Sequence, residues 1–404
     1  MLKESLWSRN FILLILSNLF LFLALEMLLP TLPIFAKDKG GTDTEVGLII
    51  GLFTFSAVFL RLFVGVASDK FGKKGLLIAG VAICLIGTAS YLAAATIAVM
   101  LALRIVHGVG FGISTTLYGT VASDIIPASR RGEGLGIFGT GNAVAISIGP
   151  FLGIWLMESF GFPTMFIVGA VILALAGILT AFVKSDSSVP GDSAARRITA
   201  EPMPWWHRFI EPKALMPSLL GLLMGLSFGG ILSFITLFGK ETGVQNIGYF
   251  FLVVALSEFL IRFVSGRIFD TKGRFWVLFP SAVLCIIGCI LLYFTDTTAM
   301  LMVSGVFYGA GLGAMFPALQ AWVIDRVEPH RRGVATATFY NAFDLGIGFG
   351  AIVLGFVVAW TNYATMYLTS SVFFIAFLVI YSIYEQRLKQ GRWNETESPR
   401  KQAV

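Results

Sequence analysis

The sequence predicts an all-α membrane protein with 12 transmembrane helices, built as two six-helix pseudo-repeats. Three observations lead to this prediction: the composition, the length of the apolar runs, and an internal repeat. Of the 404 residues, 56% are apolar and only 13% are charged, whereas about a quarter of the residues in a typical soluble domain are charged. The mean hydropathy is +0.84. Lipid, rather than water, is therefore the expected surroundings of most of the chain.

The apolar runs set the number of predicted helices. About a dozen runs reach 18 residues or more, the length at which a helix crosses a hydrocarbon core of about 30 Å. In lipid, such a run satisfies its own backbone polar groups only as a helix. The first run is too long for the apolar core of a signal peptide, so we expect an uncleaved span. The expected spans are 11–35, 45–68, 75–95, 97–119, 133–159, 163–184, 214–240, 246–270, 275–294, 299–323, 332–360 and 363–385.

Lysine and arginine residues indicate the orientation. If both termini are cytoplasmic, 23 of the 29 lie in cytoplasmic segments, three lie outside (Lys37, Lys39 and Lys240) and three lie within spans. Positive residues concentrate on the cytoplasmic side of membrane proteins. The sequence therefore predicts a multi-pass protein of the cell (inner or plasma) membrane with cytoplasmic termini. The net charge of +6 follows from this topology and requires no nucleic-acid partner.

A polar stretch divides the chain between the sixth and seventh spans, and its composition cannot form a core of its own. The predicted parts are a first half at 1–184, a cytoplasmic linker at 185–213, a second half at 214–385 and a polar, disordered cytoplasmic tail at 386–404. The three cysteines lie in apolar runs without histidines nearby, so we expect packing residues rather than disulfides or metal ligands.

An offset of 201 residues aligns the two halves. It relates Arg61 to Arg262, Asp69 to Asp270, Cys84 to Cys285, Asp124 to Asp325 and Gly149 to Gly350, and it relates Gly108, Gly110 and Gly112 to Gly309, Gly311 and Gly313. Two parallel repeats of six spans place a solute site near the bilayer midplane, between the halves.

Two loops carry the same pattern. The loop after the second span reads GVASDKFGKK from Gly65 to Lys74, and the loop after the eighth reads GRIFDTKGR from Gly266 to Arg274. Glycines such as Gly72 and Gly273 permit a tight turn, and Asp69 and Asp270 can each face the positive N-terminus of a neighbouring helix. These loops resemble the signature loop of the major facilitator superfamily; the alternative is a merely basic topogenic loop.

Two further motifs resemble the same superfamily. The fourth span reads RIVHGVGFG from Arg104, with His107 where the family usually has glutamine, and its glycines suit close helix packing. The fifth span has the spacing of the antiporter motif of exporters, with Ala145 where glycine is typical. The residues of that motif are Gly136, Gly149, Pro150 and Gly153. The resemblance implies the major facilitator fold and places Glu26, Arg104 and His107 along the solute path.

Charged side chains within the spans call for a partner or a function, because a charge at the bilayer centre costs about 2.5–3.5 kcal/mol. Glu26 and Arg104 are predicted at similar heights, and a carboxylate paired there could change protonation as access alternates. A permanent ion pair is the alternative. His107 is either a packing residue or a proton relay.

Two further pairs of charges are predicted. Glu258 and Arg262 are one helical turn apart and could neutralise each other. Arg61 and Asp344 come from opposite halves, and a bond between them would form when the cytoplasmic side closes and break when it opens. The alternative is that Asp344 caps local polar groups with Asn341 and never meets Arg61.

The predicted function is export of a small amphipathic or lipophilic solute by proton antiport, since no nucleotide-binding motif is present. Alternatives are export of one endogenous compound such as a metallophore, sugar or lipid-linked glycan, uptake of a sugar or organic acid, or a non-transporting sensor. No catalytic constellation, cofactor or metal site is expected, and the expected partners are the solute, protons and the lipid bilayer, with the protein as a monomer. The candidate lining residues are Phe20, Phe22, Met27, Met224, Phe228, Phe234, Phe238 and Met315.

Overall fold

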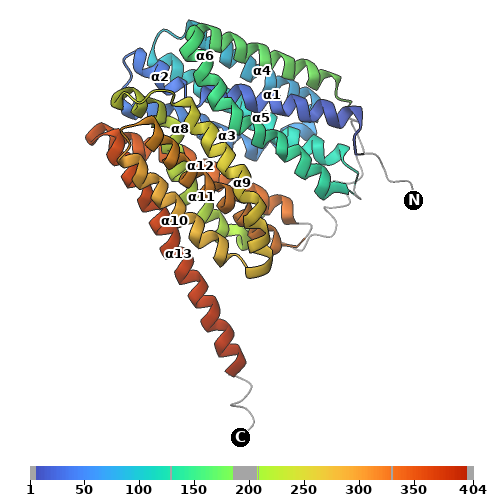
Figure 1. Ribbon diagram of the computed structural model, residues 1–404. Helices are drawn as coiled ribbons and strands as arrows, with labels where there is room; N and C mark the ends of the chain where they lie inside the picture. Colours follow the sequence, from blue (N-terminus) through green and yellow to red (C-terminus); the bar gives the residue numbers. More distant parts are fainter. Residues whose placement is uncertain (1–5, 128–129, 185–206, 208, 329–330, 398–404) are drawn as a thin grey trace.

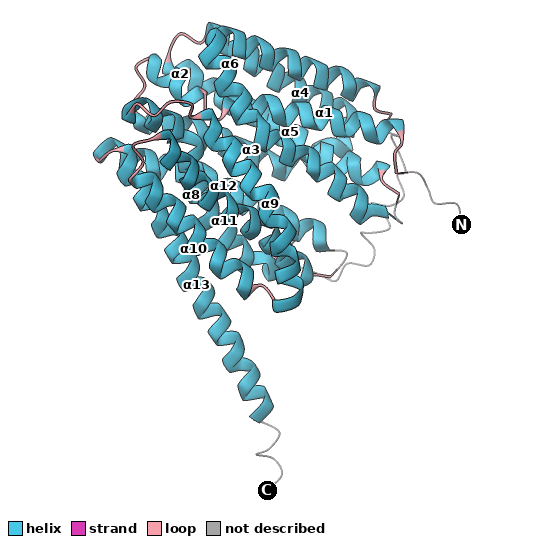
Figure 2. Cartoon of the chain, viewed as in Figure 1, coloured by secondary structure: helices cyan, strands magenta, loops and turns pink. Residues whose placement is uncertain are grey.

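The structure is a computed structural model that describes residues 6–127, 130–184, 207, 209–328 and 331–397. Within these ranges all regular elements are helices (Figures 1 and 2). They are α1 (Arg9–Leu28), α2 (Leu32–Asp38), α3 (Asp43–Phe71), α4 (Lys73–Ser90), η1 (Tyr91–Ala93), α5 (Ile97–Ile125), α6 (Arg131–Phe182), η4 (Pro212–Ala214), α8 (Leu215–Thr242), α9 (Gly248–Lys272), α10 (Phe275–Tyr293), α11 (Thr298–Asp325), α12 (Arg332–Trp360) and α13 (Tyr363–Glu397). Eleven helical stretches in the described part are long and apolar enough to cross a membrane.

The helices form two groups. Elements α1–α6 lie together in one group and α8–α13 in the other, and the two groups diverge toward the chain ends (Figure 1). We call this side, which also holds residues 183–184, 207 and 209–214, the linker end, and the other side the opposite end. The divergence means that the groups meet at the opposite end and along α3 and α12, which cross at the centre.

Contacts between the groups gather at the opposite end. The hydroxyl of Thr236 donates to the carbonyl oxygen of Pro30 at 2.8 Å, and the hydroxyl of Tyr363 donates to Asp43 at 2.8 Å. Further contacts there are Lys240–Asp38 at 3.5 Å, the stacked rings of Phe151 and Tyr249 with centroids 6.0 Å apart, and the close backbone approach of Gly47 to Ala351. The opposite end is therefore closed.

The 201-residue offset recurs in the contacts. A β-carbon added at Gly108 would lie 2.2 Å from the carbonyl oxygen of Phe53, and one added at Gly309 would lie 2.5 Å from that of Val254. The thiol of Cys84 contacts the carbonyl oxygen of His107 at 3.9 Å. The corresponding contact, Cys285 to Tyr308, measures 3.8 Å, and all three cysteines are free and buried, as expected. The glycines thus pack α5 on α3 and α11 on α9.

Capping side chains determine where several helices begin. The hydroxyl of Thr42 accepts from the backbone N–H of Glu45 while the carboxylate of Glu45 accepts from that of Thr42, which is a capping box at the start of α3. Thr96 and Thr297, again 201 residues apart, cap α5 and α11 through their hydroxyls. Glycine at positive φ ends the helices at the signature loops, with φ 80° at Gly72 and 85° at Gly273.

The structure departs from the predicted elements in three places. The first predicted span, 11–35, is divided between α1 and α2, because Pro30 and Pro33 interrupt the pattern of backbone hydrogen bonds. α6 joins the predicted spans 133–159 and 163–184 into one element of 52 residues, inside which Gly161 has non-helical angles of φ 80° and ψ 169°.

The third departure concerns the polar tail, which was expected to lack fixed structure. α13 continues to Glu397, so the prediction is wrong for residues 386–397, while 398–404 lie outside the described residues. The sequence after Glu385 begins with the good helix formers Gln386, Arg387 and Leu388. A helix already stabilised by the bundle can extend over such residues without further packing.

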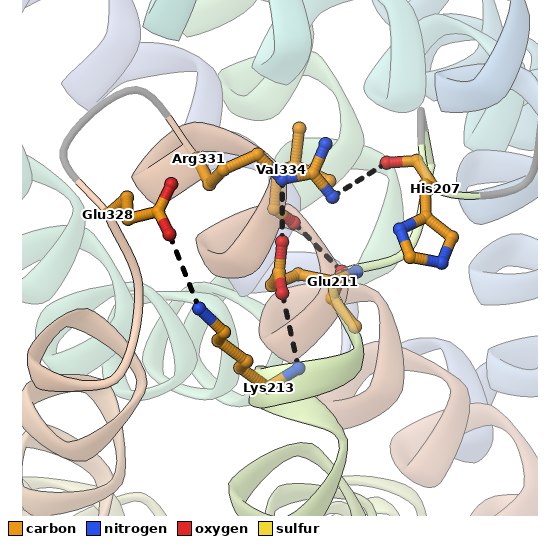
Figure 3. A network of polar contacts seen from close by, with 7 residues as sticks. His207, Glu211, Lys213, Glu328, Arg331 and Val334 are labelled. Atoms are coloured by element: carbon orange, nitrogen blue, oxygen red, sulfur yellow. Dashed lines mark hydrogen bonds and ion pairs between the residues drawn. The ribbon is translucent and has the colours of Figure 1, made fainter. Parts of the chain in front are cut away.

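The last residues before α8 are attached to the second group of helices (Figure 3). The guanidinium of Arg331 donates from Nε to the carboxylate of Glu211 at 2.7 Å and from Nη2 to the carbonyl oxygen of His207 at 2.8 Å. The backbone N–H of Glu211 donates to the hydroxyl of Thr338 at 3.0 Å. Lys213 pairs with Glu328 at 3.5 Å. Residues 207 and 209–213 are therefore held against the start of α12.

Candidate functional site

Three polar side chains meet where the two groups of helices cross, Arg61 of α3 and Asn341 and Asp344 of α12, and Glu26 of α1 is close enough to Asp344 to interact with it electrostatically. We call these four residues the central polar group. Arg61 Nη1 forms an ion pair with the carboxylate of Asp344 and lies 3.4 Å from the side-chain oxygen of Asn341. All four are partly exposed. The predicted contact between Arg61 and Asp344 is thus present, and Asn341 belongs to it.

The predicted timing of this contact, which would form when the cytoplasmic side closes and break when it opens, stays a prediction. In this structure the bond is present while the two groups diverge at the linker end. The reason is its height: Arg61 and Asp344 lie about ten residues from the linker-end termini of α3 and α12, where the groups still touch. A contact near the point of divergence moves little when the ends separate.

Glu26 stands beside this pair. Its side chain is partly exposed, and the charged residue that acts on it electrostatically is Asp344, which has the same sign. The described ion pairs leave Glu26 without a cation. Two acidic groups from opposite groups of helices therefore share one region with a single arginine.

Aromatic rings surround the central polar group. The guanidinium of Arg61 lies 5.7 Å from the ring centroid of Phe111, which in turn contacts Phe22 at 5.6 Å. On the side of α12, Phe343 stacks on Phe228 at 6.2 Å and contacts Phe316 at 5.1 Å. Among the candidate lining residues, Phe20, Phe22 and Phe228 are partly exposed, whereas the other five are buried in packed interiors: Met27, Met224, Phe234, Phe238 and Met315.

The predicted pair of Glu26 and Arg104 is absent. Arg104 is fully buried, its Nε donates to the carbonyl oxygen of Ile49 at 2.8 Å, and its guanidinium lies 4.1 Å from the ring centroid of Phe53. These partners belong to α3, so Arg104 lies inside the first group of helices. Counting along the chain gives the height of Arg104, but the rotation of α5 turns it toward α3 and not toward α1.

His107 is likewise directed into the first group. Its Nε2 lies 3.4 Å from the hydroxyl of Thr88 of α4, and its ring contacts Gly87 and, edge-on, Phe53. It is fully buried. The structure does not bring it to Glu26, so packing against α4 is the arrangement observed.

The antiporter-motif residues of α6 pack directly on α1 at the height of Glu26. A β-carbon added at Gly149 would lie 2.5 Å from the β-carbon of Glu26, and one at Gly153 would lie 2.3 Å from the carbonyl oxygen of Met27. Pro150, between them, is buried within the helix. A β-carbon at Gly136, by contrast, would meet nothing within 4 Å.

We expect Gly149→Ala to reduce transport at least about tenfold, because the added methyl group overlaps the β-carbon of Glu26 and α1 must move away. Gly136→Ala is the matched control, with the same chemical change in the same helix and open space around it. Initial rates measured at equal protein abundance distinguish the two variants. Equal rates for both would show that the close approach at Gly149 has no role.

The remaining predicted residues are arranged as follows. Glu258 and Arg262 of α9 form the predicted pair one turn apart, at 3.6 Å, and α11 packs on Glu258 through Gly313. Asp270 is exposed, and the side chain of Asp69 lies outside the described residues. Gly65 and Gly266 have open space on the side where a β-carbon would project. In the part of the chain that is described, no three His, Cys, Asp or Glu side chains gather as metal ligands.

Sequence reasoning missed several polar residues. Asn18 of α1 donates to Asn142 of α6, and Lys73 pairs with Asp124 at 2.6 Å, joining the first signature loop to the end of α5. Tyr91 was also missed. Polar residues within apolar runs were a signal for the two asparagines, because an amide in a membrane interior requires a hydrogen-bonding partner.

Long apolar helices in two groups, with charged residues between them, are typical of a multi-pass membrane protein. The chain matches the Major Facilitator Superfamily over residues 14–297 and 243–404. The protein belongs to this family of membrane transporters.

Individual relatives agree with this assignment. The chain is 24% identical over 400 residues to the multi-drug resistance efflux pump PmrA of Streptococcus pneumoniae, covering 96% of this chain and 98% of the pump. It is 23% identical over 361 residues to an uncharacterized MFS-type transporter of Methanocaldococcus jannaschii, covering 89% and 93%. A crystal structure of the nucleoside transporter NupG superposes with a TM-score of 0.70 at 17% identity, covering 93% of this chain and 99% of NupG. The latter likeness concerns the fold.

Proposed function

We propose that this transporter exports a small amphipathic or lipophilic solute in exchange for protons. The observation that carries the proposal is Glu26, a carboxyl group between the two groups of helices that lacks a cationic partner among the described residues. Inside a bilayer such a group is a default candidate for binding protons or a cation. The full-length similarity to an efflux pump supports export.

The proposal includes a topology. Division of α6 at Gly161 would give twelve crossings, six in each half, and the contacts that recur at the 201-residue offset support two related halves. With the linker end in the cytoplasm, as the lysine and arginine distribution indicates, the arrangement seen here opens inward. The protein would work as a monomer in the cell membrane, with both termini cytoplasmic and without catalytic activity.

Exchange of solute for protons follows because the solute and the proton bind in the same region, around Glu26. When the site faces the cytoplasm, a solute enters among Phe22, Phe228 and Phe343 while Glu26 releases its proton. When it faces outward, protonation of Glu26 removes the charge and favours release of the solute. Glu26 and Asp344 are close enough to interact electrostatically, so the charge on one affects the charge on the other. A single charge change can thus be coupled to solute occupancy.

Proton exchange can be measured in inverted membrane vesicles that carry an acidic interior. Ethidium and Hoechst 33342 serve as amphipathic probes, and a pH-sensitive dye reports the gradient. We expect each transported probe to dissipate the gradient and to accumulate inside, and a protonophore to abolish accumulation. ATP-dependent accumulation that survives a protonophore would disprove proton antiport. Uptake of sugars or organic acids without exchange would favour the importer.

A further inference from the structure

Arg104 is buried without enough partners. Its side chain is 0% exposed, and only Nε has a hydrogen bond, to the carbonyl oxygen of Ile49. Nη1 and Nη2 have no hydrogen-bond partner among the described residues. The guanidinium lies 4.1 Å from the ring centroid of Phe53, which attracts the positive charge. The ring does not replace the hydrogen-bond acceptors that Nη1 and Nη2 lack. The carbonyl oxygen of Ile49 and the ring of Phe53 satisfy this cation only in part, and an acceptor with negative charge would satisfy the remaining N–H groups.

Two other buried polar atoms near Arg104 also lack partners within the described chain. They are the hydroxyl of Tyr91 and Nδ1 of His107, on side chains that are 0% exposed. The rings of Tyr91 and His107 lie 6.0 Å apart, and the ring of Phe53 lies 5.9 Å from that of His107. The Tyr91 hydroxyl is close enough to the Arg104 guanidinium for an electrostatic and a weak hydrogen-bonding interaction, but this contact falls short of normal hydrogen-bond geometry, and the hydroxyl and both Nη atoms of Arg104 have no partner among the described residues. Three side chains from η1 and α5, each with polar atoms that lack a partner, therefore lie next to one another.

The three groups have the same chemical character. The guanidinium offers N–H donors only, and the phenol offers an O–H donor. The His107 imidazole, when its Nε2 accepts from the hydroxyl of Thr88 at 3.4 Å, carries its proton on Nδ1 and donates there. An acceptor with a single negative charge would satisfy all three. No described carboxylate supplies it, because the ion pairs of the described chain do not include Arg104.

The surroundings limit the size of the acceptor. α5 and α3 touch backbone to backbone at Gly108 and Phe53, and all three donor side chains are fully buried. A solute carboxylate or a phosphate would require the helices to separate. A monatomic halide requires much less space, only somewhat more than a water molecule.

We propose that Arg104, Tyr91 and His107 bind a small monovalent anion of the size of chloride inside the first group of helices. The site is separate from the central polar group and does not depend on the transported solute. The anion neutralises Arg104, so that α3, α4 and α5 pack as one unit with no uncompensated charge. The anion is a permanent part of the folded protein and stays bound while the two groups of helices move.

The test is thermal unfolding of the purified protein in chloride, bromide or gluconate at constant pH, cation and ionic strength. We expect chloride and bromide to raise Tm in a saturable way, by about 3 °C or more at saturation, since an ion that binds only the folded state stabilises it. Arg104→Gln should remove the response. Arg267→Gln, which removes an exposed arginine of α9, is the matched control and should retain it.

Two further measurements decide the matter if Arg104→Gln does not fold. Tyr91→Phe removes one donor and should raise the chloride concentration at half-maximal stabilisation several-fold. A crystal grown in bromide should show an anomalous peak within about 3.5 Å of the Arg104 Nη atoms. Equal Tm in chloride and gluconate, together with a water and no bromide at this position, would overturn the proposal whatever the transport assays show.

Discussion

Glu26→Gln is expected to abolish accumulation driven by a pH gradient, to below about a tenth of the wild-type rate, while the protein still folds. Glutamine keeps the shape that packs against Gly149 but cannot take up or release a proton. Since Glu26 has no ion-pair partner among the described residues, its neutralisation breaks no salt bridge. Energy-independent exchange of solute across the membrane should therefore continue. Counterflow and gradient-driven uptake, measured on the same proteoliposomes, separate these two activities.

The matched control for this prediction is Glu241→Gln. Glu241 is an exposed acidic residue near the end of α8, so the substitution is chemically identical but lies far from the central polar group. It should leave both activities near wild type. Gradient-driven accumulation retained in Glu26→Gln would assign Glu26 to packing, and the next carboxyl group to test would be Asp344.

Charge reversal at the central contact should have the second large effect. Arg61→Asp places three acidic groups together with Glu26 and Asp344, and Asp344→Arg places two cations against each other. Each should lower transport at least about tenfold and destabilise the fold by roughly 1.5–3 kcal/mol, the range for hydrogen bonds to charged groups. The double swap restores opposite charges across α3 and α12 and should recover several-fold more transport than either single change. Initial rates and chemical unfolding report the two effects.

The position of the contact between Arg61 and Asp344 leads to a second expected result. A bond near the point of divergence should be present in inward-open and outward-open states, so cysteines at positions 61 and 344 should crosslink in both. Crosslinking only when the linker end is closed would return the contact to the role of a latch. A double swap no better than the worse single variant would mean that the ion pair contributes nothing specific.

Much of the fold could be predicted because the repeat carries structural information. The 201-residue offset predicts which glycines correspond, and the contacts of Gly108 and Gly309 agree residue by residue. Helical spacing also predicts the pair Glu258 and Arg262, since residues one turn apart share a face in any helix. Such features depend only on the chain's own periodicity.

Other features could not be predicted, because they depend on the rotation of a helix about its axis. The height of Arg104 in α5 follows from counting, but its direction toward Phe53 follows from where Gly108 lets α3 approach. Tyr91 gave no signal at all. It reaches Arg104 because the short helix η1 ends the predicted third span. The break at Gly161 is similarly a matter of backbone angle.

The close approach of paired helices has a mechanical consequence. Where Gly112 lies against the backbone of Ala57 and Gly313 against that of Glu258, two helices are matched residue for residue, and sliding by one position would drive a side chain into a backbone. Each set of three helices, α3–α5 and α9–α11, therefore behaves as a stiff lever. The transporter therefore opens and closes by rotation of these levers about the crossing of α3 and α12. Small displacements at the centre then become large ones at the membrane surfaces.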